Sequence, residues 1–189
     1  MYVCKRDYFE EFEELQKHEV VVGHPHLVME LPVNTEPHLT LFVSHRWTSN
    51  AHPDQDSQCP SANNKKLRAL KAFLKCPELR EVQYVWIDYQ CIPQDDTANQ
   101  QLAINSLPFY VRQCGHFVSL FGNEHRRSLI DEYLKRGWCL LEMFSSFSRR
   151  ETRMWRYNID GDGQQAKELS KSSVAKFISN PLVGHFTGI

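Results

Sequence analysis

Short apolar runs that alternate with helical segments are the feature that most constrains how this chain folds. The runs are near-continuous, as in strands that are buried on both faces of a parallel sheet. They comprise residues 39–43 (LTLFV), 82–88 (VQYVWID), 116–121 (HFVSLF) and 152–159 (TRMWRYNI). Helical spacing is found between them in residues 65–76, 97–114 and 136–149. The alternation predicts an α/β protein with a three-layer, flavodoxin-like fold and a central parallel sheet.

The flanking segments predict further elements. Tyr8, Phe12 and Leu15 have helical spacing and predict a helix over residues 7–18, and residues 26–33 predict an extra strand or an extended lead-in. We expect Pro108 to kink the helix of residues 97–114, Gly115 to cap its end, and a last helix to span residues 164–179. The predicted organisation is an N-terminal extension over residues 1–35 and an α/β domain over residues 36–189.

Charge and composition exclude several classes of protein. The 22 basic and 23 acidic residues leave a net charge of −1, which argues against nucleic acid as a partner. No apolar run approaches the roughly 18 residues of a membrane span, so no membrane partner is expected. Six scattered cysteines without a CxxC pair indicate reduced thiols in a cytoplasmic protein. His24 and His26 flank a proline in a loop, and we predict no metal site.

Ligands of parallel α/β sheets bind beyond the carboxyl ends of the strands. The segments at those ends are Ser44, His45, Arg46 and Trp47 after the first strand, Asp88 to Gln94 after the second, and the start of the helix at residues 136–149. Arg46 would contact a phosphate or ribose, or instead form an ion pair with Asp88. Asp88 would touch a ligand or hold the loop of residues 89–96 in place.

The helix of residues 136–149 has an unusual polar face. Leu140, Phe144 and Phe147 cluster on one side and predict the core stripe. The opposite side groups Glu142 with Trp138, Cys139, Ser145 and Ser146. A carboxylate surrounded by an aromatic ring and small residues is typical of a cleft wall, although an interface or a solvent-facing glutamate at the first turn gives the same pattern.

Two blocks of sequence resemble a known family. YVWIDYQCIPQ (84–94) resembles the W-I-D-x-x-C-I-x-Q signature of fungal heterokaryon-incompatibility (HET) domains, and RGWCLLE (136–142) resembles their R-G-W-T-L-Q-E block. The chain is also similar to Toll/interleukin-1 receptor (TIR) domains, through FVSHRW (42–47) and through WCLLE, which matches the plant WxxxE motif. The resemblance covers roughly residues 39–160. Pro93 stands where HET domains usually have Asn, and Cys139 where they usually have Thr.

The resemblance implies an NAD⁺-cleaving enzyme with a TIR-like fold, which uses NAD⁺ as substrate and needs no cofactor. Glu142 matches the required carboxylate, which would stabilise the oxocarbenium-like cation formed on the ribose. Trp138 would stack on the cationic nicotinamide ring. The remaining candidates for substrate binding are Ser44, His45, Arg46, Trp47, Asp88 and Cys139.

The same resemblance implies regulation by assembly. Tyr89, Pro93 and Gln94 would belong to a loop that gates the pocket and contacts a neighbouring subunit in a homo-oligomer or filament. The expected setting is defence or cell death. Two other functions stay open: a non-catalytic TIR-like module that acts by self-association, and a glycosyl-transfer enzyme similar to the nucleoside deoxyribosyltransferases.

Overall fold

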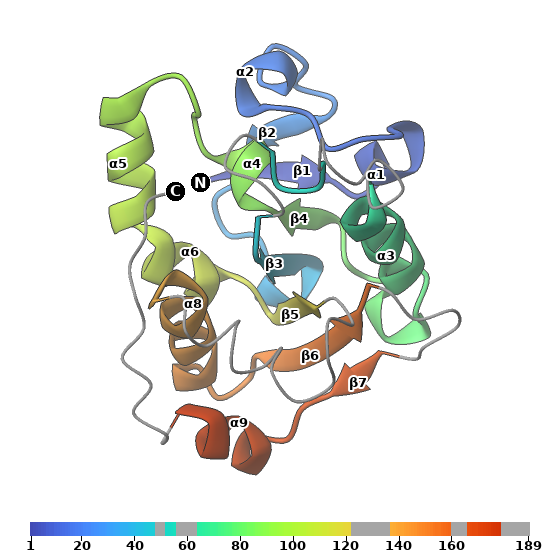
Figure 1. The fold of residues 1–189 in the computed structure, drawn as a ribbon, viewed down its shortest axis with the longest axis vertical. Helices are drawn as coiled ribbons and strands as arrows, with labels where there is room; N and C mark the ends of the chain where they lie inside the picture. The colour runs from blue at the N-terminus through green and yellow to red at the C-terminus, as the bar shows by residue number, and fades with distance from the viewer. Residues whose placement is uncertain (48–51, 56–63, 122–136, 160–165, 179–189) are drawn as a thin grey trace.

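The computed structural model describes residues 1–47, 52–55, 64–121, 137–159 and 166–178, which form a seven-stranded sheet with helices around it (Figure 1). The strands follow the order β2-β1-β4-β3-β5-β6-β7 across the sheet. They are β1 (Tyr2–Lys5), β2 (Val28–Glu30), β3 (Thr40–His45), β4 (Tyr84–Trp86), β5 (His116–Phe121), β6 (Arg153–Asn158) and β7 (Lys167–Glu168). The predicted α/β class is confirmed.

The four central strands β4, β3, β5 and β6 are parallel. Their order follows the first four strands of the flavodoxin-like pattern, in which the chain leaves β3 toward β4 and then returns to β5 on the other side. All six residues of β3 are buried, which explains its near-continuous apolar sequence. The predicted central parallel sheet is confirmed, and β1, β2 and β7 extend it with antiparallel strands.

Helices cover both faces of the sheet. They are α1 (Tyr8–Glu11), α2 (His18–Val21), α3 (Lys65–Leu74), α4 (Asp88–Cys91), α5 (Thr97–Asn105), α6 (Leu107–Gln113), α8 (Gly137–Ser148) and α9 (Lys171–Ile178), with 3₁₀ turns at Pro37–Leu39 and Pro77–Leu79. Helices α5, α6 and α8 lie on one side of the sheet and α1 and α3 on the other (Figure 1). This arrangement gives the three layers, and it places α8 against α6 and β3.

The core is built from the residues that the apolar runs predict. On α3, Leu67, Leu70, Phe73 and Leu74 are all buried, as their helical spacing predicts. On the other face of the sheet, the ring of Phe42 stacks between Trp86, at a centroid distance of 4.2 Å, and Phe117, at 5.8 Å. These rings bring β4, β3 and β5 into one packed layer and leave the strand ends for polar side chains.

The prediction of one helix over residues 7–18 was wrong. The chain instead forms β1, the short helices α1 and α2, and non-helical backbone between them. The apolar residues of the predicted stripe still pack: Tyr8 and Leu15 are buried, and the ring of Phe12 stacks on Tyr8 at 4.1 Å. Tertiary packing therefore satisfies these side chains without a continuous helix. The predicted strand within residues 26–33 is confirmed as β2.

Three other predictions about helices need correction. Residues 97–114 form two helices separated at Ser106, with Pro108 in the first turn of α6. Gly115 does not cap a helix. It is needed because its backbone lies against Pro37, where an added Cβ would be 2.6 Å from the Pro37 carbonyl oxygen. The last helix begins at Lys171, later than expected, because Lys167 and Glu168 pair with β6.

The cysteines that the structure describes are free thiols. Free thiols are found at Cys4, Cys76, Cys91, Cys114 and Cys139, while Cys59 lies outside the described residues. Burial raises the pKa of the Cys114 thiol to about 12, so this group stays protonated and acts as an apolar core residue. Within the same residues, none of the helices combines the length and the apolar character that crossing a bilayer requires.

Asp54 caps α3 from outside the helix, and its replacement is expected to destabilise the fold. The buried carboxylate accepts hydrogen bonds from the backbone N–H groups of Lys66 and Leu67, each at 2.9 Å. Asp54→Ala is expected to lower the free energy of unfolding in urea by about 1–2 kcal/mol. Asp54→Asn keeps one acceptor oxygen and should lose less. Equal losses in the two variants would contradict a capping role.

Candidate functional site

The carboxyl ends of β3 and β4 and the first turns of α8 meet at one edge of the sheet. β3 ends with Ser44 and His45, and Asp88 opens α4 two residues after β4 ends. The Ser44 hydroxyl donates to the Oε2 atom of Glu142 on α8, and the His45 ring pairs with Asp88. Consecutive residues of a strand point to opposite faces, so the end of β3 contacts one carboxylate on each side.

Asp88 connects the end of β3 to the start of α4. Its Oδ1 atom lies 2.9 Å from Nε2 of His45 and accepts the Tyr89 backbone N–H at 2.7 Å. Its Oδ2 atom accepts the indole N–H of Trp47 at 2.6 Å. Burial acts to raise the pKa of Asp88, but the charge and hydrogen bond of His45 and the two other donors outweigh burial and hold this pKa below its ordinary value. Asp88 is therefore an ionised carboxylate that fixes the local backbone.

The His45 ring is oriented by Asp88 through one of its two nitrogens, Nε2. The side chain is 1% exposed, and Nε2 faces the Asp88 carboxylate. Nδ1 is buried and has no hydrogen-bond partner among the described residues. In the neutral tautomer that donates Nε2–H to Asp88, Nδ1 is an acceptor. A buried nitrogen of this kind is uncommon, and it can accept a hydrogen bond from a water or a ligand.

Glu142 lies on the buried side of α8, which corrects the predicted core stripe. Phe144 is 52% exposed, whereas Glu142 is 9% exposed and faces β3 through Ser44. Leu140 and Phe147 are only partly buried. Glu142 faces the sheet because the Ser44 hydroxyl of β3 lies opposite it and donates a hydrogen bond to its carboxylate. The interpretation of Glu142 as solvent-facing is wrong.

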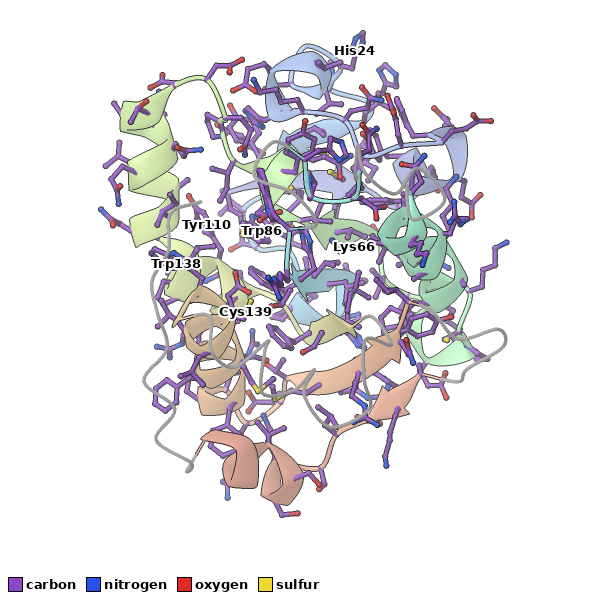
Figure 2. The ribbon with its side chains drawn as sticks, in the orientation of Figure 1. His24, Lys66, Trp86, Tyr110, Trp138 and Cys139 are labelled. Atoms are coloured by element: carbon purple, nitrogen blue, oxygen red, sulfur yellow. The ribbon has the colours of Figure 1, made fainter. Side chains whose placement is uncertain are left out.

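Cys139 and Trp138 begin the same helix and point in different directions. The Cys139 thiol is buried and lies 3.9 Å from the His45 carbonyl oxygen, which fastens the first turn of α8 to β3. Trp138 is partly buried and packs against the core. Figure 2 places Trp138 on the α6 side of α8, near Tyr110, and Cys139 on the side of the sheet. Trp138 and Glu142 are four residues apart, one turn along the helix.

Arg46 does not form the ion pair with Asp88 that the sequence left open. Asp88 instead hydrogen-bonds to His45, and the Arg46 side chain is exposed. Alternation along the chain explains the choice, since His45 and Trp47 both point toward Asp88 while the residue between them points away. The alternative expectation, a guanidinium that contacts a ligand, remains compatible with this position.

The loop after α4 is fastened to the N-terminal extension. The Glu19 carboxylate accepts the backbone N–H groups of Gln94, at 2.6 Å, and Asp95, at 2.9 Å. Lys17 pairs with the Asp95 side chain. At the start of the loop, Tyr89 contacts Trp47 edge-to-face at 5.5 Å, and Pro93 is partly buried. These contacts join the expected gating residues to α2 and to the end of β3.

The described residues hold no group of three His, Cys, Asp or Glu side chains in an arrangement that fits a metal ion. His24 and His26 lie close, with ring centroids 5.7 Å apart, and have exposed side chains. The functional groups that the described residues bring to the edge of the sheet are carboxylates, an imidazole and a hydroxyl.

Sequence reasoning named Ser44, His45, Asp88 and Glu142 but not the bonds between them. It proposed Ser44 as a substrate-binding residue and did not predict that its hydroxyl donates to Glu142. It also missed His52, whose ring contacts Tyr89 edge-to-face at 4.9 Å. Partners that are 98 residues apart leave no local signal in one sequence. A usable signal was the lone carboxylate on an otherwise uncharged helix face opposite a serine at a strand end.

Comparison with known proteins identifies the surrounding segment. Residues 41–129 match the family model of the heterokaryon incompatibility protein (HET). This match confirms the resemblance to HET domains that is based on the motif at residues 84–94. The matched span contains Ser44 and Asp88, whereas the RGWCLLE block at residues 136–142 lies outside it. No curated protein and no solved structure matches the chain.

Proposed function

We propose that this HET-type domain cleaves the bond between nicotinamide and ribose in NAD⁺, with Glu142 as the catalytic carboxylate. The products would be nicotinamide and ADP-ribose or its cyclic form, and the setting would be cell death or defence in the cytoplasm. The similarity of WCLLE to the WxxxE motif of TIR domains supports this assignment, as does the HET match in the preceding segment.

The observation that carries the proposal is the position of Glu142. Its carboxylate is almost fully buried at the carboxyl end of β3, next to the point where the chain switches from β4 to β5. Open α/β sheets bind their ligands at such switch points. A carboxylate has a high cost of burial unless it is paired or hydrogen-bonded, and functional sites are where such groups are retained.

The chemistry needs one negative charge close to the sugar. As the C1′–N bond breaks, its electron pair goes to the nicotinamide nitrogen, which becomes neutral, and positive charge develops on the ribose. Glu142 stabilises that charge through space. In hydrolysis, water then adds to C1′ and releases one proton. Burial strengthens the electrostatic effect, because the carboxylate acts in an environment of lower dielectric constant than water.

Other residues have supporting roles in this scheme. Trp138, one turn before Glu142, offers a ring on which the cationic nicotinamide stacks. Arg46 is exposed just beyond β3 and suits the pyrophosphate. Asp88 holds His45 and Trp47 in place and thereby shapes the end of β3 without touching NAD⁺.

The proposal is tested by incubating the concentrated protein with NAD⁺ and separating the products by chromatography. Time-dependent release of free nicotinamide above samples without protein and with heat-denatured protein supports it. A parallel incubation with a deoxynucleoside and a free base tests the glycosyl-transfer alternative. Base exchange without nicotinamide release would replace the proposed reaction by that one.

Exposed apolar side chains favour self-association as a second function. Leu102 is 64% exposed on α5, Phe109 is 61% exposed on α6, and Phe144 is exposed on α8. All three helices belong to the same layer (Figure 1). Large exposed apolar groups that recur on one side of a domain are typical of interaction surfaces. Association through them is compatible with catalysis and would also suffice for a non-catalytic signalling module.

If association completes the site, specific activity is expected to rise with protein concentration. Turnover should be low at nanomolar protein and increase toward tens of micromolar, in parallel with mass measured by light scattering. Phe109→Ser should weaken both effects. Val33→Ser is the matched control, because Val33 is 90% exposed but lies after β2 and outside this layer. Constant specific activity from a confirmed monomer would contradict a shared site.

A further inference from the structure

Two bonds fasten the start of α8 to the end of β3. The Ser44 hydroxyl donates to Oε2 of Glu142, and the Cys139 thiol lies 3.9 Å from the carbonyl oxygen of His45. All four residues are buried. The catalytic carboxylate proposed above is therefore held to a rigid central strand as well as to its own helix.

Because the Ser44 hydroxyl donates its proton to Glu142, it cannot donate the same proton to a ligand. A serine hydroxyl has one proton to donate, and that of Ser44 is given to Glu142. An ionised carboxylate only accepts, so the hydroxyl fixes both the side-chain rotamer of Glu142 and the oxygen that faces β3. The second carboxylate oxygen is then left in a defined orientation.

We propose that Ser44 is a positioning residue for Glu142, and that it is not part of the surface that binds substrate. This inference rests on the proposed function for its kinetic consequences, and on geometry alone for its structural ones. Ser44 aims the carboxylate at the ribose and keeps a buried charge supplied with a donor. A misplacement of about 1 Å at a reacting group costs roughly 10²-fold in rate.

The neighbouring strand provides a matched control. Ser119 of β5 is the register partner of Ser44 in β3, so both side chains lie on the same face of the sheet at the same level. Both are buried, at 1% exposure for Ser44 and 0% for Ser119. The Ser119 hydroxyl has no hydrogen-bond partner within the part of the chain that the structure describes. Removing it changes the same number of atoms in the same layer and keeps the Ser44–Glu142 hydrogen bond.

The kinetic experiment compares nicotinamide release by the wild type, Ser44→Ala, Ser119→Ala and Ser44→Thr. Ser44→Ala is expected to lower kcat by on the order of 10²-fold with KM changed less than threefold. Ser119→Ala should stay within threefold of the wild type in both constants, and Ser44→Thr, which keeps a hydroxyl, should recover part of kcat. A Ser44→Ala variant that changes only KM, or one that matches Ser119→Ala, would overturn the proposal.

A structural measurement separates this inference from the proposed function. The unfolding equilibrium constants of Ser44→Ala, Glu142→Ala and the double variant form a cycle that reports coupling whether or not NAD⁺ is cleaved, because each single variant removes one partner of the hydrogen bond. We expect the double variant to be at least threefold more stable than the two single effects predict. If the two effects are coupled but no nicotinamide is released, the inference about Ser44 and Glu142 stands and the proposed function is wrong. Additive effects overturn the inference itself.

Discussion

Glu142→Gln is expected to reduce nicotinamide release by about 10²–10⁴-fold while the protein stays folded. Glutamine has nearly the same volume and keeps an oxygen that accepts the Ser44 hydroxyl proton, but it lacks the negative charge that stabilises the ribose cation. The rate is measured by chromatography at saturating NAD⁺, and the fold is checked by thermal unfolding.

A second acidic residue close to α8 provides the control for this substitution. Glu151 follows the helix, is 78% exposed and pairs with Arg149 at 3.6 Å. Glu151→Gln is expected to leave the rate unchanged. A fall of less than tenfold in Glu142→Gln would remove Glu142 from the catalytic role. A large drop in Tm for that variant would instead mean that the carboxylate is needed for folding.

Acidification is expected to destabilise the protein through His116, at the opposite end of the sheet from Glu142. Burial, helped by the positive charge of Arg153, lowers the pKa of His116 to about 4. The unfolded chain would bind this proton near pH 6.5. Stability is therefore complete above pH 6.5 and is lost as the pH falls toward 4, because the unfolded state binds more protons in that range.

The expected loss from this one group is about 3 kcal/mol between pH 7 and pH 4, measured by urea unfolding at several pH values. His116→Gln is the control, because an amide oxygen still accepts the Trp155 indole N–H, now donated to Nδ1 at 3.4 Å, but does not titrate. The variant should have a shallower pH dependence than the wild type. Parallel curves for the two proteins would show that His116 is not the titrating group.

The central strands were predictable because they are buried on both faces. β3 and β5 appear in the sequence as near-continuous apolar runs, and the apolar residues of α3 have regular helical spacing. β1 and β7 were not predictable. They are short, they lie outside the parallel core, and β7 consists only of Lys167 and Glu168, which are exposed. Such strands exist because a neighbouring strand offers them hydrogen bonds, which no pattern within four residues reveals.

The candidate site was predictable as a set of residues and less so as a set of contacts. The rule for carboxyl ends of parallel strands selected Ser44, His45 and Asp88 without any alignment. The orientation of α8 was not predictable, because its apolar residues formed a convincing stripe although Phe144 is exposed. A buried Glu142 that bonds to a serine in β3 outweighs that stripe. A pattern of apolar and polar residues does not reveal that a hydrogen bond can place a polar residue on the buried side of a helix.

The two outermost strands of the described sheet limit the ways in which copies of this domain can associate. The described sheet ends in β2, of three residues, and β7, of two. Strands this short present too few unpaired backbone groups for another chain to prolong the sheet. The described sheet edges therefore offer little for cross-β growth. A filament of the kind that the sequence predicts would be held by side chains of helices and loops, and we expect it to come apart on dilution into intact subunits.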